Sequence, residues 1–213
     1  MHINPERSTR PDYDLLVRQV ASVLEGERDL TANAAQFSAL VYDTLADLNW
    51  AGFYLTVPAK SGGGQDLLVG PFQGKPACAR IPFGRGVCGT TAVKRETIVV
   101  PDVHAFPGHI ACDSASNSEI VIPLVKDGKL VGVFDIDSPS LDRFSDEDKA
   151  GLEAMVQDGS LQALFMTYKG PLIKRSGLAQ RRLFRIPNPS LPPETPLARS
   201  ELWYRPQESA GKH

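Results

Sequence analysis

Two β-rich runs joined by an Asp-Gly pair constrain the fold of this chain more than any other feature of its sequence. The runs cover residues 119–125 and 130–137, and the connection between them reads KDGK. An Asp-Gly pair in that position is a strong hairpin signal, because both residues tolerate the positive φ angles of turns that match strand twist. The two runs are therefore predicted to lie antiparallel in one sheet.

A second hairpin and several helices are predicted around this one. Residues 50–57 and 67–72 are β-rich and flank a glycine-rich turn, and residues 97–100 form a short β-branched run. Residues 12–48 carry apolar side chains at the spacing of two amphipathic helices. Residues 145–168 are expected to form a further helix, which begins with Ser and three acidic residues. This order predicts an α+β fold with a central antiparallel sheet flanked by helices.

The composition changes after Gly170. Seven of the 17 prolines lie in residues 171–213, where eight basic residues stand against three acidic ones. Such a segment is typically extended, although its several apolar side chains indicate partial docking. We therefore predict one domain at residues 1–170 and an extended or loosely docked, Pro-rich basic tail at residues 171–213.

Charge and hydropathy exclude several classes of protein. A formal charge of −2 over 213 residues leaves no basic field for nucleic acid. No apolar run reaches the roughly 18 residues that span a bilayer, and the N-terminus is polar where a signal peptide would be apolar. We expect a cytoplasmic protein with a small ligand and no membrane partner. Its cysteines should then be thiols rather than structural disulfides.

The three cysteines fall in two segments rich in glycine, proline and small polar residues. Cys78 and Cys88 lie within residues 70–90, and Cys112 lies in the long connection of residues 101–118. Long connections inside compact domains are often functional. A single free cysteine is commonly just a small buried side chain, but three in such segments favour thiol chemistry.

Three carboxyl groups are candidates for a binding or catalytic site. Asp135 and Asp137 are two residues apart on a predicted strand, so both side chains point to one face of the sheet. Adjacent carboxylates repel unless a cation, such as an ammonium group or a metal, lies between them; alternatively the pair ends the strand in solvent. Glu119 opens the preceding strand after the Cys112 loop, where a partly desolvated carboxyl group could keep its proton near neutral pH.

His104, His109 and Cys112 invite a zinc interpretation, since histidine, cysteine and a carboxylate form a familiar ligand set. Their spacing is irregular, and no pair of ligands has the CxxC arrangement of a zinc knuckle. We therefore expect histidines that are exposed or support other groups, and no metal.

Four motifs together carry a family resemblance. They are NWAGFYL from residue 49, GPFQGKPACARIPFGRGVCGT from residue 70, DVHAFPGHIACDSASNSEIVIPL from residue 102 and FDIDSP from residue 134. In order and spacing they resemble the free methionine-(R)-sulfoxide reductases, a catalytic branch of the GAF domains. The resemblance covers roughly residues 11–167. It implies a GAF-type fold in which two cysteine-bearing loops roof a small pocket with Asp135 and Asp137 on its floor.

The resemblance implies reduction of free methionine (R)-sulfoxide by cysteine chemistry. Cys112 would be the nucleophile and would become a sulfenic acid, Cys78 its usual resolving partner and Cys88 a secondary one. An external dithiol such as thioredoxin would then reduce the disulfide. No metal or organic cofactor is implied, and a homodimer is plausible because family members associate through helices.

The polar and aromatic residues also receive roles from the resemblance. Glu119, assisted by Asp137, would donate a proton to the departing oxygen, and Asp135 with Asp137 would hold the substrate ammonium. Trp50 and Tyr54 either pack the thioether methyl or belong to the core. A different class of function is open as well: a GAF module that binds a small ligand for regulation without turnover, in which three cysteines would have no purpose.

Overall fold

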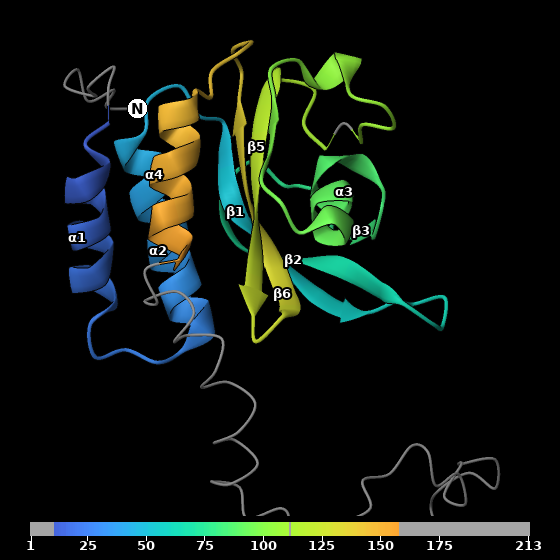
Figure 1. Cartoon of the computed structure of the whole chain (residues 1–213), viewed down its shortest axis with the longest axis horizontal. Coiled ribbons are helices and arrows are strands. Elements are labelled where there is room, and N and C mark those ends of the chain that lie inside the picture. Colours follow the sequence, from blue (N-terminus) through green and yellow to red (C-terminus); the bar gives the residue numbers. More distant parts are fainter. Residues whose placement is uncertain (1–10, 111, 158–213) are drawn as a thin grey trace, which may run out of the picture. The chain divides into compact units, whose positions relative to one another are not determined.

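The computed structural model describes residues 11–110 and 112–157, which form an α+β domain (Figure 1). Both predicted hairpins, the two N-terminal helices and the strand after residue 97 are confirmed, whereas the sequence did not predict β3, whose three residues show no periodic pattern. The predicted tail and the last part of the predicted final helix lie outside the described residues. The elements are α1 (Tyr13–Leu24), α2 (Leu30–Thr44), β1 (Trp50–Pro58), β2 (Gln65–Gly74), β3 (Arg80–Pro82), α3 (Gly86–Lys94), β4 (Ile98–Val100), the 3-10 turn η1 (Val103–Ala105), β5 (Ser118–Lys126), β6 (Lys129–Ser138) and α4 (Asp146–Gln157).

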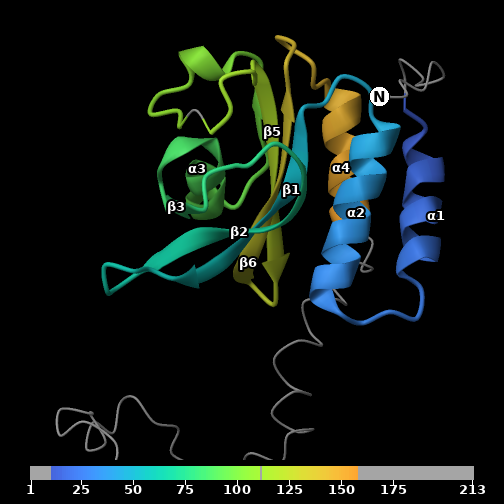
Figure 2. The ribbon, with the colours of Figure 1, turned by 180° about the vertical axis from the view of Figure 1, so that it is seen from behind.

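Six strands form one sheet in the order β3-β2-β1-β6-β5-β4, and every neighbouring pair is antiparallel. The helices α1, α2 and α4 lie on one face of this sheet, called here the helical face (Figures 1 and 2). The helix α3 and the connections around it lie on the opposite face, called here the α3 face. The predicted central sheet flanked by helices is therefore confirmed.

Alternation along β5 and β6 decides which side chains reach each face. Ile120 and Ile136 are register partners, fully buried in the apolar core that includes side chains of α1, α2 and α4. Their chain neighbours Glu119 and Asp137 are also register partners and point to the α3 face. A shift of one residue would exchange the two sets, so burial of the isoleucines specifies where the carboxyl groups lie.

Ser145 caps α4 as the sequence predicts. The Asp148 N–H donates to Oγ of Ser145 (3.2 Å), and the Ser145 N–H donates to the Asp148 carboxylate (2.8 Å). This reciprocal pair satisfies two backbone donors at the helix start. The Tyr13 hydroxyl also donates to Asp148 (2.7 Å), which ties α1 to α4. Among the described helices, none is long and apolar enough to cross a membrane.

Candidate active site

Carboxyl and aromatic side chains gather at one end of the α3 face. Asp137 on β6 is paired in register with Trp50 on β1 and with Glu119 on β5. Asp135 lies two residues earlier on β6 and therefore points to the same face. Asp135 and Asp137 therefore share one face as expected, and the register pairing of Glu119 with Asp137 brings the carboxyl group of β5 beside those of β6.

Cys88 reaches this group from α3, which packs across the sheet. Its thiol is unpaired and buried, and it donates to Oε1 of Glu119 over 3.8 Å. Gly89 allows the close approach of α3, because a Cβ there would overlap the carbonyl oxygen of Pro82. Burial raises the pKa of the Cys88 thiol well above its ordinary value, and the charge of Asp135 adds to the effect. Cys88 is therefore a neutral hydrogen-bond donor at physiological pH.

Cys78 and Cys112 form a disulfide between the β2–β3 connection and the loop before β5, with Cα atoms 5.3 Å apart. Two aromatic side chains hold the Cys78 segment against the sheet. The Tyr54 hydroxyl donates to the carbonyl oxygen of Cys78 (3.0 Å), and the Trp50 indole N–H donates to that of Lys75 (3.2 Å). Both rings are buried and both line the cavity, so these two residues contact the site and also position the segment that carries Cys78.

Residues that sequence reasoning missed anchor the Cys112 loop. The Asn49 amide donates to Oγ of Ser116 (3.0 Å) and to Oδ2 of Asp113 (3.3 Å). Nζ of Lys75 lies 3.4 Å from the same Asp113 oxygen, which links the two cysteine-bearing segments beside their disulfide. Only the position of Asn49 at the head of a motif could have singled it out from the sequence, because its partners lie more than sixty residues away along the chain.

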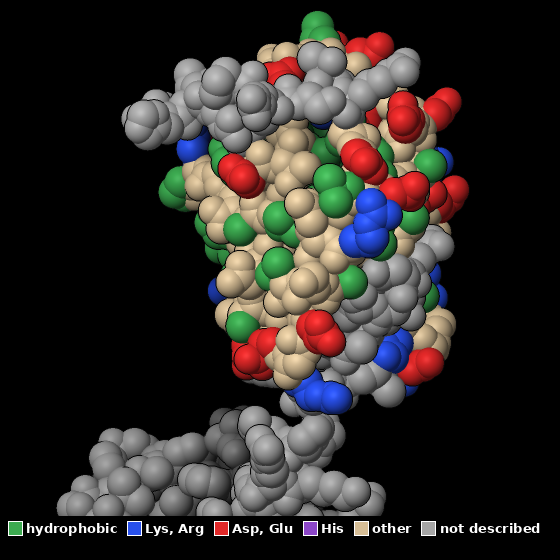
Figure 3. Space-filling model, turned by 90° about the vertical axis from the view of Figure 1, so that its left-hand side faces the viewer, with side chains coloured by type: hydrophobic (Ala, Val, Ile, Leu, Met, Phe, Trp, Pro, Cys, Tyr) green, Lys and Arg blue, Asp and Glu red, His purple; other side chains and the backbone are tan. Residues whose placement is uncertain are grey.

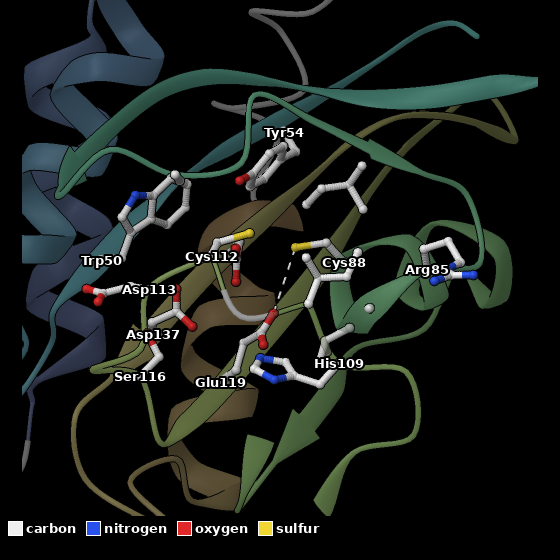
Figure 4. A pocket seen from close by; sticks show the side chains of 16 residues that line it. Trp50, Tyr54, Arg85, Cys88, His109, Cys112, Asp113, Ser116, Glu119 and Asp137 are labelled. Atoms are coloured by element: carbon white, nitrogen blue, oxygen red, sulfur yellow. Dashed lines mark hydrogen bonds between the residues drawn. The ribbon is translucent and has the colours of Figure 1, made fainter. Parts of the chain in front are cut away.

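The carboxyl and aromatic side chains described above, with Cys88 and Cys112, line one cavity on the α3 face (Figure 4). The empty space within it, with the open solvent at its mouth included, is about 440 Å³. The side chains of Cys112, Cys88 and Glu119 point into the same space. Asp135, Asp137, Trp50 and Tyr54 also line it, so the structure brings together every predicted site residue except Cys78, which joins the site through its disulfide to Cys112.

Burial keeps the carboxyl groups of Glu119, Asp135 and Asp137 from ionising together. Burial, and then the charges of Asp135 and Asp137, raise the pKa of Glu119 well above its ordinary value. Burial raises the pKa of Asp135 to about 6 and that of Asp137 well above its ordinary value. Among the described residues, Oδ1 of Asp135 has no hydrogen-bond partner although it is buried. The cavity can therefore keep a proton on Glu119 and accept a cation at Asp135.

The zinc set that the sequence suggested does not assemble. Cys112 is bonded to Cys78, and the exposed His104 ring makes a hydrogen bond with Oδ1 of Asn117 (3.1 Å). His109 lines the cavity, where burial and then the nearby His104 lower its pKa. In the part of the chain that the structure describes, neither histidine belongs to a cluster of three or more side chains that could hold a metal ion.

Comparison with known proteins identifies the family. Residues 31–161 match the GAF domain. Protein YtsP of Bacillus subtilis is 56% identical over 138 residues, which are 65% of this chain and 82% of that protein. The free methionine-R-sulfoxide reductase of Escherichia coli is 51% identical over 144 residues, which are 68% of this chain and 84% of that protein. This chain belongs to the free methionine-R-sulfoxide reductase family.

A solved structure agrees with this assignment. The fRMsr of Staphylococcus aureus, determined as a complex with its substrate, is 48% identical and superposes with a TM-score of 0.65. The match covers 77% of this chain and 99% of that one. The GAF-type fold and the oxidoreductase class implied by the four motifs are therefore confirmed. These relatives favour an enzyme over a GAF module that only binds a regulatory ligand.

Proposed function

We propose that this reductase converts free methionine (R)-S-oxide to methionine with Cys112 as the nucleophile. The observation that carries the proposal is the position of Cys112, which lines a cavity together with Glu119, Asp135 and Asp137 and is bonded to a second cysteine. Sulfoxide reduction needs a thiolate, which Cys112 supplies once its disulfide is reduced, and a proton donor, for which Glu119 is available. The name of the relative from Escherichia coli supports this substrate.

The proposed reaction starts from reduced cysteines. The Cys112 thiolate attacks the sulfoxide sulfur while the Glu119 carboxyl donates its proton to the sulfoxide oxygen, with Asp137 beside it. The new bond between Sγ of Cys112 and the substrate sulfur then breaks together with the substrate S–O bond. The protonated oxygen passes to Cys112, two electrons stay on the substrate sulfur, and methionine leaves. The sulfenic acid on Cys112 then loses water to the Cys78 thiol and forms the disulfide, which a dithiol such as thioredoxin reduces.

Substrate recognition follows from the charges and rings of the cavity. Asp135, whose Oδ1 lacks a hydrogen-bond partner among the described residues, is the proposed partner of the substrate ammonium together with Asp137. The rings of Trp50 and Tyr54 stack with their centroids 5.7 Å apart and offer an apolar surface for the thioether methyl. The segment that carries Cys112 lines the cavity beside the carboxyl groups and would exclude a methionine within a polypeptide.

Methionine formation from the separated (R) and (S) sulfoxides tests the proposed function. With a dithiol present, the (R) form should yield methionine and the (S) form should not. A peptide that contains methionine sulfoxide serves as the control for the free amino acid and should also be inert. Equal reduction of both epimers, or of the peptide, would contradict the proposed specificity, and no reduction of any of them would contradict the function.

Cys78→Ser should stop the reaction after the first turnover when thioredoxin is the reductant. The first half-reaction needs only Cys112, so about one methionine should form per chain, and the sulfenic acid then has no resolving thiol. Counting methionine against enzyme measures this. A small dithiol, which can reach the sulfenic acid directly, should restore turnover. Sustained turnover with thioredoxin would mean instead that Cys88 resolves the intermediate.

Asp135→Asn and Asp137→Asn should each weaken substrate binding. A desolvated charged hydrogen bond is worth about 1.5–3 kcal/mol, so the apparent Kd should rise by about tenfold or more. Equilibrium binding to the Cys112→Ser chain would separate affinity from chemistry. An N-acetylated sulfoxide, which lacks the ammonium group, should bind both parent and variants equally. If neither substitution raises the Kd tenfold, the pair has a structural role.

The proposal also covers the reductant, the location, the oligomeric state and the tail. We propose thioredoxin as reductant in the cytoplasm, where dithiols keep cysteines reduced.

A homodimer would use the outer face of α1, where Leu15 and Val23 are 44% and 47% exposed and hydrophobic side chains are scattered among polar ones (Figure 3). The predicted tail at residues 171–213, which is proposed to supply no catalytic group, lies outside the described residues.

A further inference from the structure

Three donor groups that differ in chemistry converge beneath the cavity. A ligand atom from each of Cys88, Glu119 and Asp135 lies within 4.8 Å of the other two. They come from α3, β5 and β6, so separate elements of the fold hold them in place. Their exposed fractions are only 4%, 6% and 6%, yet all three line the cavity, which gives a small ion a path to them.

This cluster is short of positive charge. Oδ1 of Asp135 is buried and has no hydrogen-bond partner among the described residues. An unpartnered buried carboxylate oxygen costs free energy unless a donor or cation reaches it. The proposed substrate would supply an ammonium group there, but an ammonium would make no use of the sulfur of Cys88. A thiolate with two carboxylates is instead a ligand set for a borderline-soft divalent ion.

We propose that Cys88, Glu119 and Asp135 bind one Zn²⁺ ion when the substrate is absent. The sulfur and one oxygen from each carboxylate are three ligands of a tetrahedral site, and the fourth position faces the cavity and takes water or chloride. Binding releases the thiol proton of Cys88 and the carboxyl proton of Glu119 to solvent, so no oxidant or reductant is involved. The ion occupies the place proposed for the substrate ammonium, so Zn²⁺ and substrate exclude each other.

The ligand types set the expected selectivity. Mg²⁺ and Ca²⁺ prefer six or more oxygen ligands and gain little from a thiolate, so they should not bind here at millimolar concentration. Co²⁺ accepts the same tetrahedral ligands as Zn²⁺ and reports a bound thiolate by charge-transfer absorption in the near ultraviolet. Of the three cysteines, Cys88 alone is unpaired while the Cys78–Cys112 disulfide is intact, so the absorption identifies its sulfur.

The test uses the untagged full chain with its disulfide closed and no substrate. Co²⁺ titration should give charge-transfer absorption that saturates at one ion per chain, and Zn²⁺ should displace the Co²⁺. Cys88→Ser should remove the absorption and weaken Zn²⁺ binding in calorimetry by at least about 100-fold, since even partners of ligands typically contribute 10–100-fold. Asp135→Asn should weaken Zn²⁺ binding while keeping the absorption at higher Co²⁺ concentration.

A second candidate metal site, at His104 and His109, supplies the matched control. The ring centroids of these two histidines lie 6.4 Å apart. If the ion binds at Cys88 instead, His104→Ala should leave metal binding unchanged. Loss of binding in His104→Ala, or unchanged affinity in Cys88→Ser, would overturn the proposal. Thermal unfolding checks that each variant folds, and Zn²⁺ should raise the Tm of the parent but not that of Cys88→Ser. None of these measurements uses the substrate, so they test the metal site even if the proposed reductase function is wrong.

Discussion

Replacing Cys112 with serine should abolish the turnover of methionine (R)-sulfoxide. A serine hydroxyl has neither the nucleophilicity of a thiolate nor a sulfenic acid stage, so the first half-reaction cannot begin. Loss of an enzyme's nucleophile commonly lowers kcat by several orders of magnitude, and we expect a loss of about 10⁴-fold or more. The measurement is methionine formed in one turnover at enzyme concentrations above that of the substrate.

The comparison must separate the loss of chemistry from the loss of the disulfide. Parent and variant should therefore both be assayed in excess dithiol, where neither contains the bond to Cys78. Ser114→Ala changes an exposed residue of the same loop and should keep the parent rate. Appreciable turnover by the Cys112→Ser chain would show that another thiol attacks the substrate and would remove the basis of the mechanism.

Glu119→Gln should lower the rate of methionine formation while substrate affinity stays nearly constant. Burial and the charges of Asp135 and Asp137 raise the pKa of Glu119, so its carboxyl group holds a proton that a glutamine amide of the same shape cannot donate. General acid catalysis typically contributes 10²- to 10⁴-fold, and kcat should fall by about that factor. Rapid-quench measurement of the first turnover would isolate the chemical step from disulfide reduction.

The contrast with Asp135→Asn makes this prediction specific. That variant should change mainly the apparent affinity, whereas Glu119→Gln should change mainly kcat. A general collapse of the cavity would move both quantities in both variants. An unchanged first-turnover rate in Glu119→Gln would assign proton donation to another group, and Asp137, its register partner, would be the next residue to replace.

Much of the fold could be predicted because its signals are local. The Asp-Gly turn between β5 and β6 and the glycine-rich turn between β1 and β2 specify antiparallel neighbours at short range. The alternation that places Asp135 and Asp137 on one face is likewise a property of a single strand. The short strand β3 escaped prediction because three residues are too few to show a period.

The second role of the aromatic residues could not be predicted. Trp50 and Tyr54 stand in a β-rich run that marks them as buried, but their hydrogen bonds reach the carbonyl oxygens of Lys75 and Cys78 across the β1–β2 hairpin and its following connection. Every residue has a backbone carbonyl group, so the sequence does not show which one accepts a side-chain hydrogen bond. The ion pair between Lys75 and Asp113, which links the two cysteine segments, could not be predicted either, because the two residues are far apart in the sequence.

The sequence by itself determined the hairpins, the face shared by the carboxyl groups and, through four motifs, the family. The tertiary structure decided which carboxyl group lies beside which cysteine. The family resemblance already implied Cys78 as the partner of Cys112. The packing of the loops over the sheet brings these two together, and α3 carries Cys88 to Glu119 and Asp135. These contacts join residues far apart in the chain, and only close packing of separate elements across the sheet creates them.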